Sequence, residues 1–308
     1  MRQILRRTYK LAALALVSSR AAPSVAFVRR FPIARTIRLS TRMSTTSQPD
    51  EIIFSSPALQ VYHLKYTVDS TQEEAKRLLR EQAEQSNTLS LAVIADDQKS
   101  GRGTSGRTWH ASRGNLYLTC AVPMDLIPLS KITLLPLGVG IIVAKLLARH
   151  SEIRPTVKWP NDVLLKDQKI SGTLIENFRV EQRDWWLVGI GVNIESCPQH
   201  IPTEKVDFHS TPRSATCLRE HTNSTVLPTA IDFGSQISNH LIEWIGSIQT
   251  DGAEEVVSNW KSWADMGQLY IIRETGEQVT TVDLQSDGQL KVIGSDGRER
   301  LLVSDYLY

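Results

Sequence analysis

The 308-residue chain has few cysteines and none of the common metal-binding motifs. Its cysteines, Cys120, Cys197 and Cys217, lie far apart in sequence and form no CxxC pair, and no HExxH motif occurs. These absences argue against a disulfide framework and against a zinc site of the usual spacings. We therefore expect three buried free thiols in a reducing compartment.

Acidic residues are almost missing from residues 1–50, which hold ten basic residues against Asp50 alone and carry a net charge of +9. This composition, rich in Arg, Ser and Thr, is typical of a targeting segment without a fold of its own. A mitochondrial presequence is the favoured interpretation. A bipartite plastid signal, with the apolar residues 11–17 as its core and SVAF at 24–27 as its cleavage motif, and a simple disordered tail stay open. Met43 could start a shorter cytosolic form.

The rest of the chain holds 25 basic and 32 acidic residues, a net charge of −7. An acidic body is poorly suited to non-specific nucleic-acid binding, which depends on neutralising phosphates. The apolar run at 11–17 is too short to span a bilayer. A hydrophobic content of 41% and a charged content of 22% are those of an ordinary globular protein with room for one or two domains.

Hydrophobic periodicity predicts a mixture of strands and helices in a folded part that begins near residue 57. Strands are expected at 61–70, 91–96, 115–120 and 184–195, with a hairpin over 156–180 that turns at KDQK. Helices are expected at 71–84, 132–150 and 228–263, with a short helical segment at 214–220. Four short strands separated by turns, after residue 265, predict a small β-barrel.

The stretch from residue 91 to 120 places a loop rich in glycine and arginine between two apolar strands. Glycine permits close backbone approach to a ligand, and arginine offers paired donors to carboxylate or phosphate. The loop therefore predicts an anion clamp. Its GRGTSG fits GxGxxG, but a strand rather than a helix follows, which argues against a dinucleotide-binding fold. A kinase is disfavoured because VAIK, HRD and DFG are missing.

Three further segments carry polar residues suited to chemistry. KWPND at 158–162 offers Asn161 and Asp162 to a ribose, a phosphate or magnesium, although an exposed turn would look the same. Lys169 in KISGTLIE could point into a pocket or simply be solvated. GIGVNIE at 189–195 places two glycines and Asn193 in a buried strand, as if the backbone packed against a flat ligand.

Together, the order Ser-Thr, Gln, GRGxxGRxW, KWPND, Lys-x-x-Gly-x-Leu, GxGxN resembles the biotin protein ligases (holocarboxylase synthetases) over about residues 60–308. The resemblance implies an α+β fold: a mixed sheet with flanking helices, like that of class II aminoacyl-tRNA synthetases and lipoate ligases, over 57–263. A small SH3-like domain over 265–308 is implied to follow. It also implies ATP and Mg²⁺ as cofactors, biotin as substrate, and biotin carboxyl carrier domains as partners of a monomer or homodimer.

The resemblance further implies a role for each matching residue. Lys169, Arg102 and Arg107 would be catalytic. The biotin-binding residues would be Ser70, Thr71, Gln98, Gly101, Arg102, Lys169, Gly172, Leu174 and Gly189. The residues that bind ATP and the adenylate would be Arg102, Arg107, Lys158, Asn161, Asp162, Lys169 and Asn193. Asp162 would also contact magnesium through Mg-ATP, and it is a weak candidate for the base of the transfer step.

Two departures from the family pattern matter. Thr104 stands where many members have a second arginine, and this predicts weaker retention of the adenylate unless Arg113 or another side chain compensates. Gln72 replaces a frequent asparagine, and little consequence is expected. No helix-turn-helix domain precedes the catalytic domain, so no repressor function is expected.

The sequence thus predicts an organelle-directed ligase that forms biotinyl-5'-AMP and transfers biotin to a carrier lysine. A lipoate ligase or octanoyltransferase, a catalytically inactive binding module and a DNA-binding regulator are the alternatives. The paired GRGxxGRxW and KWPND motifs argue against the first. The retained Lys169, Arg102 and Arg107 argue against the second, and the missing DNA-reading helix argues against the third.

Overall fold

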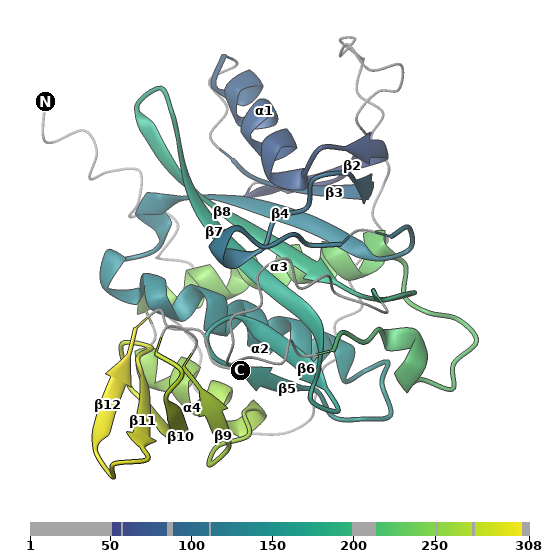
Figure 1. Ribbon diagram of the computed structural model, residues 1–308. Helices are drawn as coiled ribbons and strands as arrows, with labels where there is room; N and C mark the ends of the chain where they lie inside the picture. The colour runs from purple at the N-terminus through teal and green to yellow at the C-terminus, as the bar shows by residue number, and fades with distance from the viewer. Residues whose placement is uncertain are drawn as a thin grey trace, which may run out of the picture. The chain divides into compact units, whose positions relative to one another are not determined.

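A computed structural model describes most of the chain after residue 50, namely residues 51–56, 58–84, 89–110, 112–198, 214–250, 252–272 and 275–303. The predicted targeting segment lies outside these residues. Within them, an eight-stranded mixed sheet is flanked by α-helices and a four-stranded antiparallel sheet follows (Figure 1). This arrangement confirms the predicted α+β class.

The large sheet has the strand order β1-β2-β3-β4-β8-β7-β6-β5. Its strands are β1 (Glu51–Ser55), β2 (Leu59–Val68), β3 (Ser90–Gln98), β4 (Leu116–Pro123), β5 (Thr156–Lys158), β6 (Asp162–Leu165), β7 (Gln168–Val180) and β8 (Arg183–Val192). Only β2 and β3 pair in parallel among the described neighbours, because the helix α1 (Thr71–Glu84) makes the crossover between them. The strand β1 precedes residue 57, where the folded part was expected to begin.

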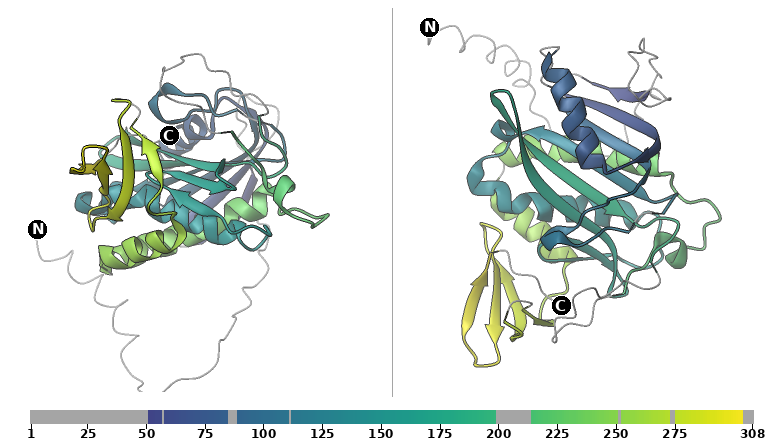
Figure 2. Two further views of the ribbon diagram at one scale, coloured as in Figure 1. Left: turned by 60° about the horizontal axis from the view of Figure 1, so that its bottom comes forward. Right: turned by 45° about the horizontal axis from the view of Figure 1, so that its top comes forward.

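Helices cover both faces of this sheet (Figure 2). On one face lies α1, whose Ala75, Leu78 and Leu79 form a buried stripe. The opposite face is covered by α2 (Leu135–Leu147) and α3 (Ala230–Thr250), and α4 (Ala253–Trp263) packs beside α2. The predicted helix over 228–263 is thus two helices.

The long apolar segment before β5 is partly 3₁₀-helical. A 3₁₀ helix, η3 (Leu129–Leu134), leads into α2, which begins next to Pro136 because proline is well accommodated in a first helical turn. The predicted helix over 132–150 is therefore shorter than expected. Leu129–Leu147 is long and apolar enough to cross a membrane, but 61% of its most apolar window is buried inside the protein, as in a core helix.

Alternating side chains along the strands build two hydrophobic clusters, one on each face. Ile94, Leu118 and Ile190 belong to the cluster beneath α2 and α3. Val93 and Leu187 belong to the cluster beneath α1. The strand pattern thus fixes which side chains face α1, and the candidate site lies on that face.

Short turns connect the strands around the site. The predicted hairpin forms between β6 and β7, and Lys166 and Asp167 at its turn have φ values of 46° and 61°. Three further 3₁₀ helices occur in the described connections, η1 (Thr104–Gly106), η2 (Met124–Leu126) and η4 (Leu218–His221). The helical segment predicted at 214–220 corresponds to η4.

The four strands predicted after residue 265 are β9 (Leu269–Ile271), β10 (Gln278–Leu284), β11 (Leu290–Gly294) and β12 (Glu299–Leu302). They pair in the order β12-β11-β10-β9. The turn between β10 and β11 contacts residues around the large sheet, since Trp159 Nε1 donates to Gly288 O at 2.9 Å and Thr133 Oγ1 to Asp287 O at 2.5 Å. The small sheet is confirmed, whereas its closure into an SH3-like barrel stays a prediction.

Candidate functional site

Two of the glycines predicted to line the site, Gly172 and Gly189, lie on the α1 face of the large sheet. Asp162 of β6 is opposite Gly172 of β7, which is opposite Gly191 of β8. Two residues away, Leu174 of β7 pairs with Gly189 of β8. Paired residues, and residues two apart, share one face of a sheet. Segments far apart in sequence thus form one surface that carries few side chains. This surface, formed by Asp162, Gly172, Leu174, Gly189 and Gly191, is termed the glycine floor.

Neighbouring side chains occupy the space above these glycines. A Cβ atom on Gly189 would lie 2.6 Å from Gln72 Nε2, and one on Gly172 would lie 2.9 Å from Lys169 Cε and 3.2 Å from the Trp109 ring. The Trp109 indole also lies directly on Gly191. The glycines are therefore needed for close approach, and Trp109 shows that a flat group fits on this floor.

Lys169 lies at the edge of the glycine floor. Its Nζ is 2.5 Å from Asp162 Oδ1 and 5.7 Å from the centre of the Trp109 ring. The side chains of Lys169 and Asp162 are 26% and 18% exposed. Half-burial between a carboxylate and an aromatic ring keeps the ammonium in place, as a group that receives a ligand anion requires.

The N-terminus of α1 brings Ser70 and Thr71 to the same face, and both are buried. Ser70 Oγ accepts a hydrogen bond from Glu73 N at 3.2 Å, so Ser70 caps the helix. Because the hydroxyl only accepts in this cap, its own proton stays available to a ligand. Thr71 Oγ1 lies 2.8 Å from Thr119 Oγ1 of β4.

The segment between β3 and β4, termed the glycine–arginine loop, folds back on itself beside α1. Gly103 N donates to Arg107 O at 2.7 Å and Trp109 N donates to Gly101 O at 2.8 Å. A Cβ atom on Gly101 would lie 2.5 Å from Nε2 of Gln98, which is largely buried. The loop backbone therefore packs onto Gln98 at the end of β3, as the motif requires.

The two predicted catalytic arginines have different partners. Arg102 Nη2 lies 3.0 Å from Glu73 Oε1 and 3.1 Å from Glu176 Oε2. Arg107 donates to Thr104 Oγ1 at 2.6 Å and to Thr104 O at 3.1 Å. Thr104, at the position where the family pattern often has arginine, is thus a neutral acceptor that orients Arg107.

Two predicted nucleotide-binding amides use their Nδ2 groups within the protein. Asn161 donates to Thr173 O at 2.7 Å, and Asn193 donates to Thr216 O at 3.0 Å. Lys158 is 7% exposed, and its Nζ lies 5.5 Å from the centre of the Tyr270 ring in β9. Asn161 adjoins Asp162 in sequence, but each of these three residues is engaged in contacts within the protein.

Three residues of the site were not among the predicted site residues. Trp109 occupies the glycine floor, and Glu176 holds Arg102. Gln72, for which little consequence was expected, donates to Leu174 O at 3.2 Å and accepts from Arg102 at 3.2 Å. Trp109 stands in GRGxxGRxW and could have been found from its motif. Glu176 and Gln72 carry no comparable signal, because their roles depend on contacts across the sheet.

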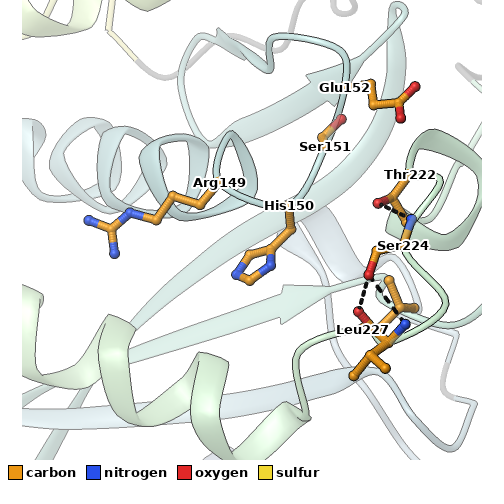
Figure 3. A pocket seen from close by; sticks show the side chains of 8 residues that line it. Arg149, His150, Ser151, Glu152, Thr222, Ser224 and Leu227 are labelled. Carbon is orange, nitrogen blue, oxygen red and sulfur yellow. Dashed lines mark hydrogen bonds between the residues drawn. The ribbon is translucent and has the colours of Figure 1, made fainter.

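A cavity of about 360 Å³ lies elsewhere, at the carboxyl end of α2 (Figure 3). It lies between the turn formed by residues 149–152 and the segment 222–227. None of the predicted site residues lines it. The functional candidate is therefore the α1 face of the sheet and not this cavity.

Comparison with known proteins agrees with this geometry. Residues 64–193, which include the whole glycine floor, match the Biotin/lipoate A/B protein ligase family. This part of the chain is similar to that family, which confirms the resemblance found in the sequence.

Among curated proteins, the bifunctional ligase/repressor BirA of Bacillus subtilis is 35% identical over 150 residues, covering 47% of this chain and 45% of that protein. The biotin–[acetyl-CoA-carboxylase] ligase of Paracoccus denitrificans is 26% identical over 257 residues, covering 78% and 97%. The chain thus spans less than half the length of the BirA proteins that it matches.

Solved structures extend the likeness over most of the described fold. The biotin protein ligase from Aquifex aeolicus in complex with biotin and ATP is 27% identical, with a TM-score of 0.63 and coverage of 80% of this chain and 97% of that one. The biotin protein ligase from Leishmania major in complex with biotinyl-5-AMP is 28% identical, with a TM-score of 0.54 and coverage of 81% and 100%.

Proposed function

We propose that the chain is an ATP-dependent biotin protein ligase. The observation that carries this proposal is the Lys169 ammonium, held between Asp162 and Trp109 at the edge of the glycine floor. The similar structures with bound biotin, ATP and biotinyl-5-AMP support the choice of ligands. The predicted roles of the site residues are part of this proposal.

In the first half-reaction, the biotin carboxylate attacks the α-phosphate of ATP, and pyrophosphate leaves. Ser70, Thr71 and Gln98 hydrogen-bond the ureido ring beside the glycine floor. Lys169 and Arg102 leave their carboxylate partners and neutralise the two anions that approach each other, which lowers the barrier of an anion–anion reaction. Arg107, oriented by Thr104, contacts the phosphates.

In the second half-reaction, a lysine amine of a biotin carrier domain attacks the carbonyl of the mixed anhydride. An amide forms, AMP leaves, and the proton of the amine passes to a base. The anhydride hydrolyses in water, so the glycine–arginine loop covers it until the amine arrives. Asp162 stands beside the reacting carboxyl group as a candidate for that base.

Magnesium fits the site as a companion of the nucleotide. The ion is bound in many nucleotide enzymes by one or two carboxylates together with phosphate oxygens. Asp162, the carboxylate on the glycine floor, would supply such an oxygen. When bound, the ion neutralises the charge of the departing pyrophosphate.

The remaining parts of the proposal concern the rest of the molecule. The net charge of +9 over residues 1–50 supports import into an organelle, with the mitochondrion favoured over the plastid and a cytosolic form starting at Met43. Fluorescent fusions to residues 1–50 decide between the compartments. The four-stranded C-terminal sheet supports an SH3-like domain. A monomer and a homodimer both stay compatible with the proposal.

Incubation of the purified chain with ATP, Mg²⁺, labelled biotin and a biotin carrier domain tests the activity. We expect label on the carrier lysine and release of pyrophosphate. An unlabelled carrier that instead accepts lipoate would make the chain a lipoate ligase. The Lys169→Ala variant serves as the inactive control.

A further inference from the structure

A second group of chemically active side chains lies away from the glycine floor, where the loop after β8 meets η4. Leu218 N donates to Asn193 O and Arg219 N donates to Ile194 O, both at 3.0 Å. This pairing brings together Cys197, Cys217 and Glu220, whose ligand atoms all lie within 4.8 Å of one another. In the part of the chain that the structure describes, no other group of His, Cys, Asp and Glu side chains meets that condition.

We propose that Cys197, Cys217 and Glu220 bind a thiophilic divalent cation such as zinc. Ligand atoms about 2.3 Å from one ion lie at most about 4.6 Å apart, so the three atoms are already close to a common coordination sphere. Two thiolates and one carboxylate are ligand types that zinc accepts, and water completes four-coordination. The sequence offered no sign of this site, because the two cysteines are brought together only by the fold.

Neighbouring residues orient the Glu220 carboxylate so that one of its oxygens points toward Cys197. Thr216 Oγ1 donates to Glu220 Oε2 at 2.7 Å, which leaves Oε1 directed at Cys197 Sγ, 3.7 Å away. The single hydroxyl proton of Thr216 is used in that bond. His221 Nε2 lies 2.7 Å from Thr216 Oγ1 and must therefore donate its proton to that oxygen. The His221 ring is thus the Nε2–H tautomer. Such relays commonly orient metal ligands.

The local charges favour a cation. The Glu220 carboxylate places a negative charge beside the two thiols. The nearby guanidinium of Arg219 is turned away, since it makes paired bonds to the carboxylate of Glu195 at 3.0 Å and 3.1 Å. The cation displaces both thiol protons to solvent.

A bound cation would join two segments that border the proposed nucleotide side of the site. Asn193, at the end of β8, already donates to Thr216 O at 3.0 Å. The cation adds a link between the segments that follow each of these residues. Its role is therefore structural, and its loss would loosen the position of Asn193.

Zinc analysis of the full chain tests the proposal. The purified protein is saturated with zinc sulfate, desalted and assayed for bound metal. We expect about one zinc per chain in the wild type and less than about a tenth in Cys197→Ser, a half-buried position where serine is readily accommodated. The Cys120→Ala variant is the matched control and keeps its zinc, because Cys120 lies in the core among the residues beneath α3.

Thermal unfolding provides a second readout that does not depend on enzyme activity. A chelator is expected to lower the unfolding temperature of the zinc-loaded wild type and to leave that of Cys197→Ser unchanged. Wild-type protein without zinc after loading overturns the proposal. So does full zinc content in Cys197→Ser. A Cys197–Cys217 disulfide in mass spectra of zinc-exposed wild type also overturns it and makes the pair a redox site.

Discussion

Lys169 and Asp162 form the contact on which the proposed chemistry depends most directly. Their 2.5 Å ion pair is partly shielded from water, so the attraction between them is stronger than in a surface pair. A ligand carboxylate must compete with Asp162 for the ammonium. The free protein thus keeps its reactive cation neutralised until an anion enters.

Replacement of Lys169 by alanine is expected to lower adenylate formation by about a hundredfold or more, because one cation aimed at the developing charge is lost. Pyrophosphate release measures this rate, and circular dichroism checks that the fold is retained. Lys65→Ala is the matched control, since Lys65 is also an ion-paired lysine on a strand, but an exposed one. Turnover close to that of the control would show that Lys169 is only a solvated lysine.

Thr104 is expected to make the protein release its adenylate faster than an arginine-bearing variant. The neutral hydroxyl orients Arg107 but contributes no charge of its own. We therefore expect Thr104→Arg to lengthen the half-life of the bound biotinyl-5'-AMP, as measured by filtration of preloaded protein. Thr104→Val, which removes only the hydroxyl, is the control for the loss of the hydrogen bond. Equal half-lives for the wild type and Thr104→Arg would contradict the expectation.

At the scale of elements, α1, β7 and the glycine–arginine loop meet at Arg102. Glu73 comes from α1 and Glu176 from β7, and Lys76 of α1 lies 3.4 Å from the same Glu176 oxygen. The Lys76 and Arg102 charges also lower the pKa of Glu73, with the hydrogen bond from Lys76 as the largest cause. This network holds the loop in place and, at the same time, occupies the arginine that is proposed to bind the ligand.

The Glu176→Gln variant is therefore expected to bind biotinyl-5'-AMP more tightly than the wild type. The Arg102 pair is largely exposed, so its contribution is at most about 1 kcal/mol, or about a fivefold change in affinity. Isothermal titration calorimetry measures this change. The control is Glu81→Gln, which removes an exposed ion pair of α1 with Arg77. Unchanged or weaker binding by Glu176→Gln would contradict the competition between Glu176 and the ligand.

Elements with local signals were predictable from the sequence. The helix α1 followed from its hydrophobic periodicity, and the hairpin of β6 and β7 followed from its turn residues. The strand β1 was missed, because it is defined by pairing with β2 and not by its own pattern. The contacts of Gln72 and Glu176 were missed for the same reason. Cys197 was expected to be buried and is only partly so.

At the scale of the whole molecule, KWPND joins the large sheet to the C-terminal sheet. The Trp159 indole is 3% exposed and donates to Gly288 O, in the turn between β10 and β11. Asp283 of β10 also contacts Lys261 of α4 at 2.8 Å. The segment that carries Asn161 and Asp162 thus depends on the last strands of the chain for its position.

Trp159→Phe is expected to lower the free energy of unfolding by about 1–3 kcal/mol, because the carbonyl of Gly288 loses its buried donor. Urea unfolding measures the change. A Trp263→Phe control alters a tryptophan that is only partly buried and lies 4.9 Å from the Arg154 guanidinium, and it should cost less. Equal losses in the two variants would count against the importance of the Gly288 contact.

The strand order also sets when the large sheet can be completed. β4 pairs with β8 and not with β5, so its second neighbour is missing until residues 183–192 have been made. Every residue of β4 is buried in the native fold. During synthesis, this apolar edge is open to pairing with other chains. Nascent chains or fragments that end between β4 and β8 should therefore aggregate, and this is the window in which the protein depends most on chaperones.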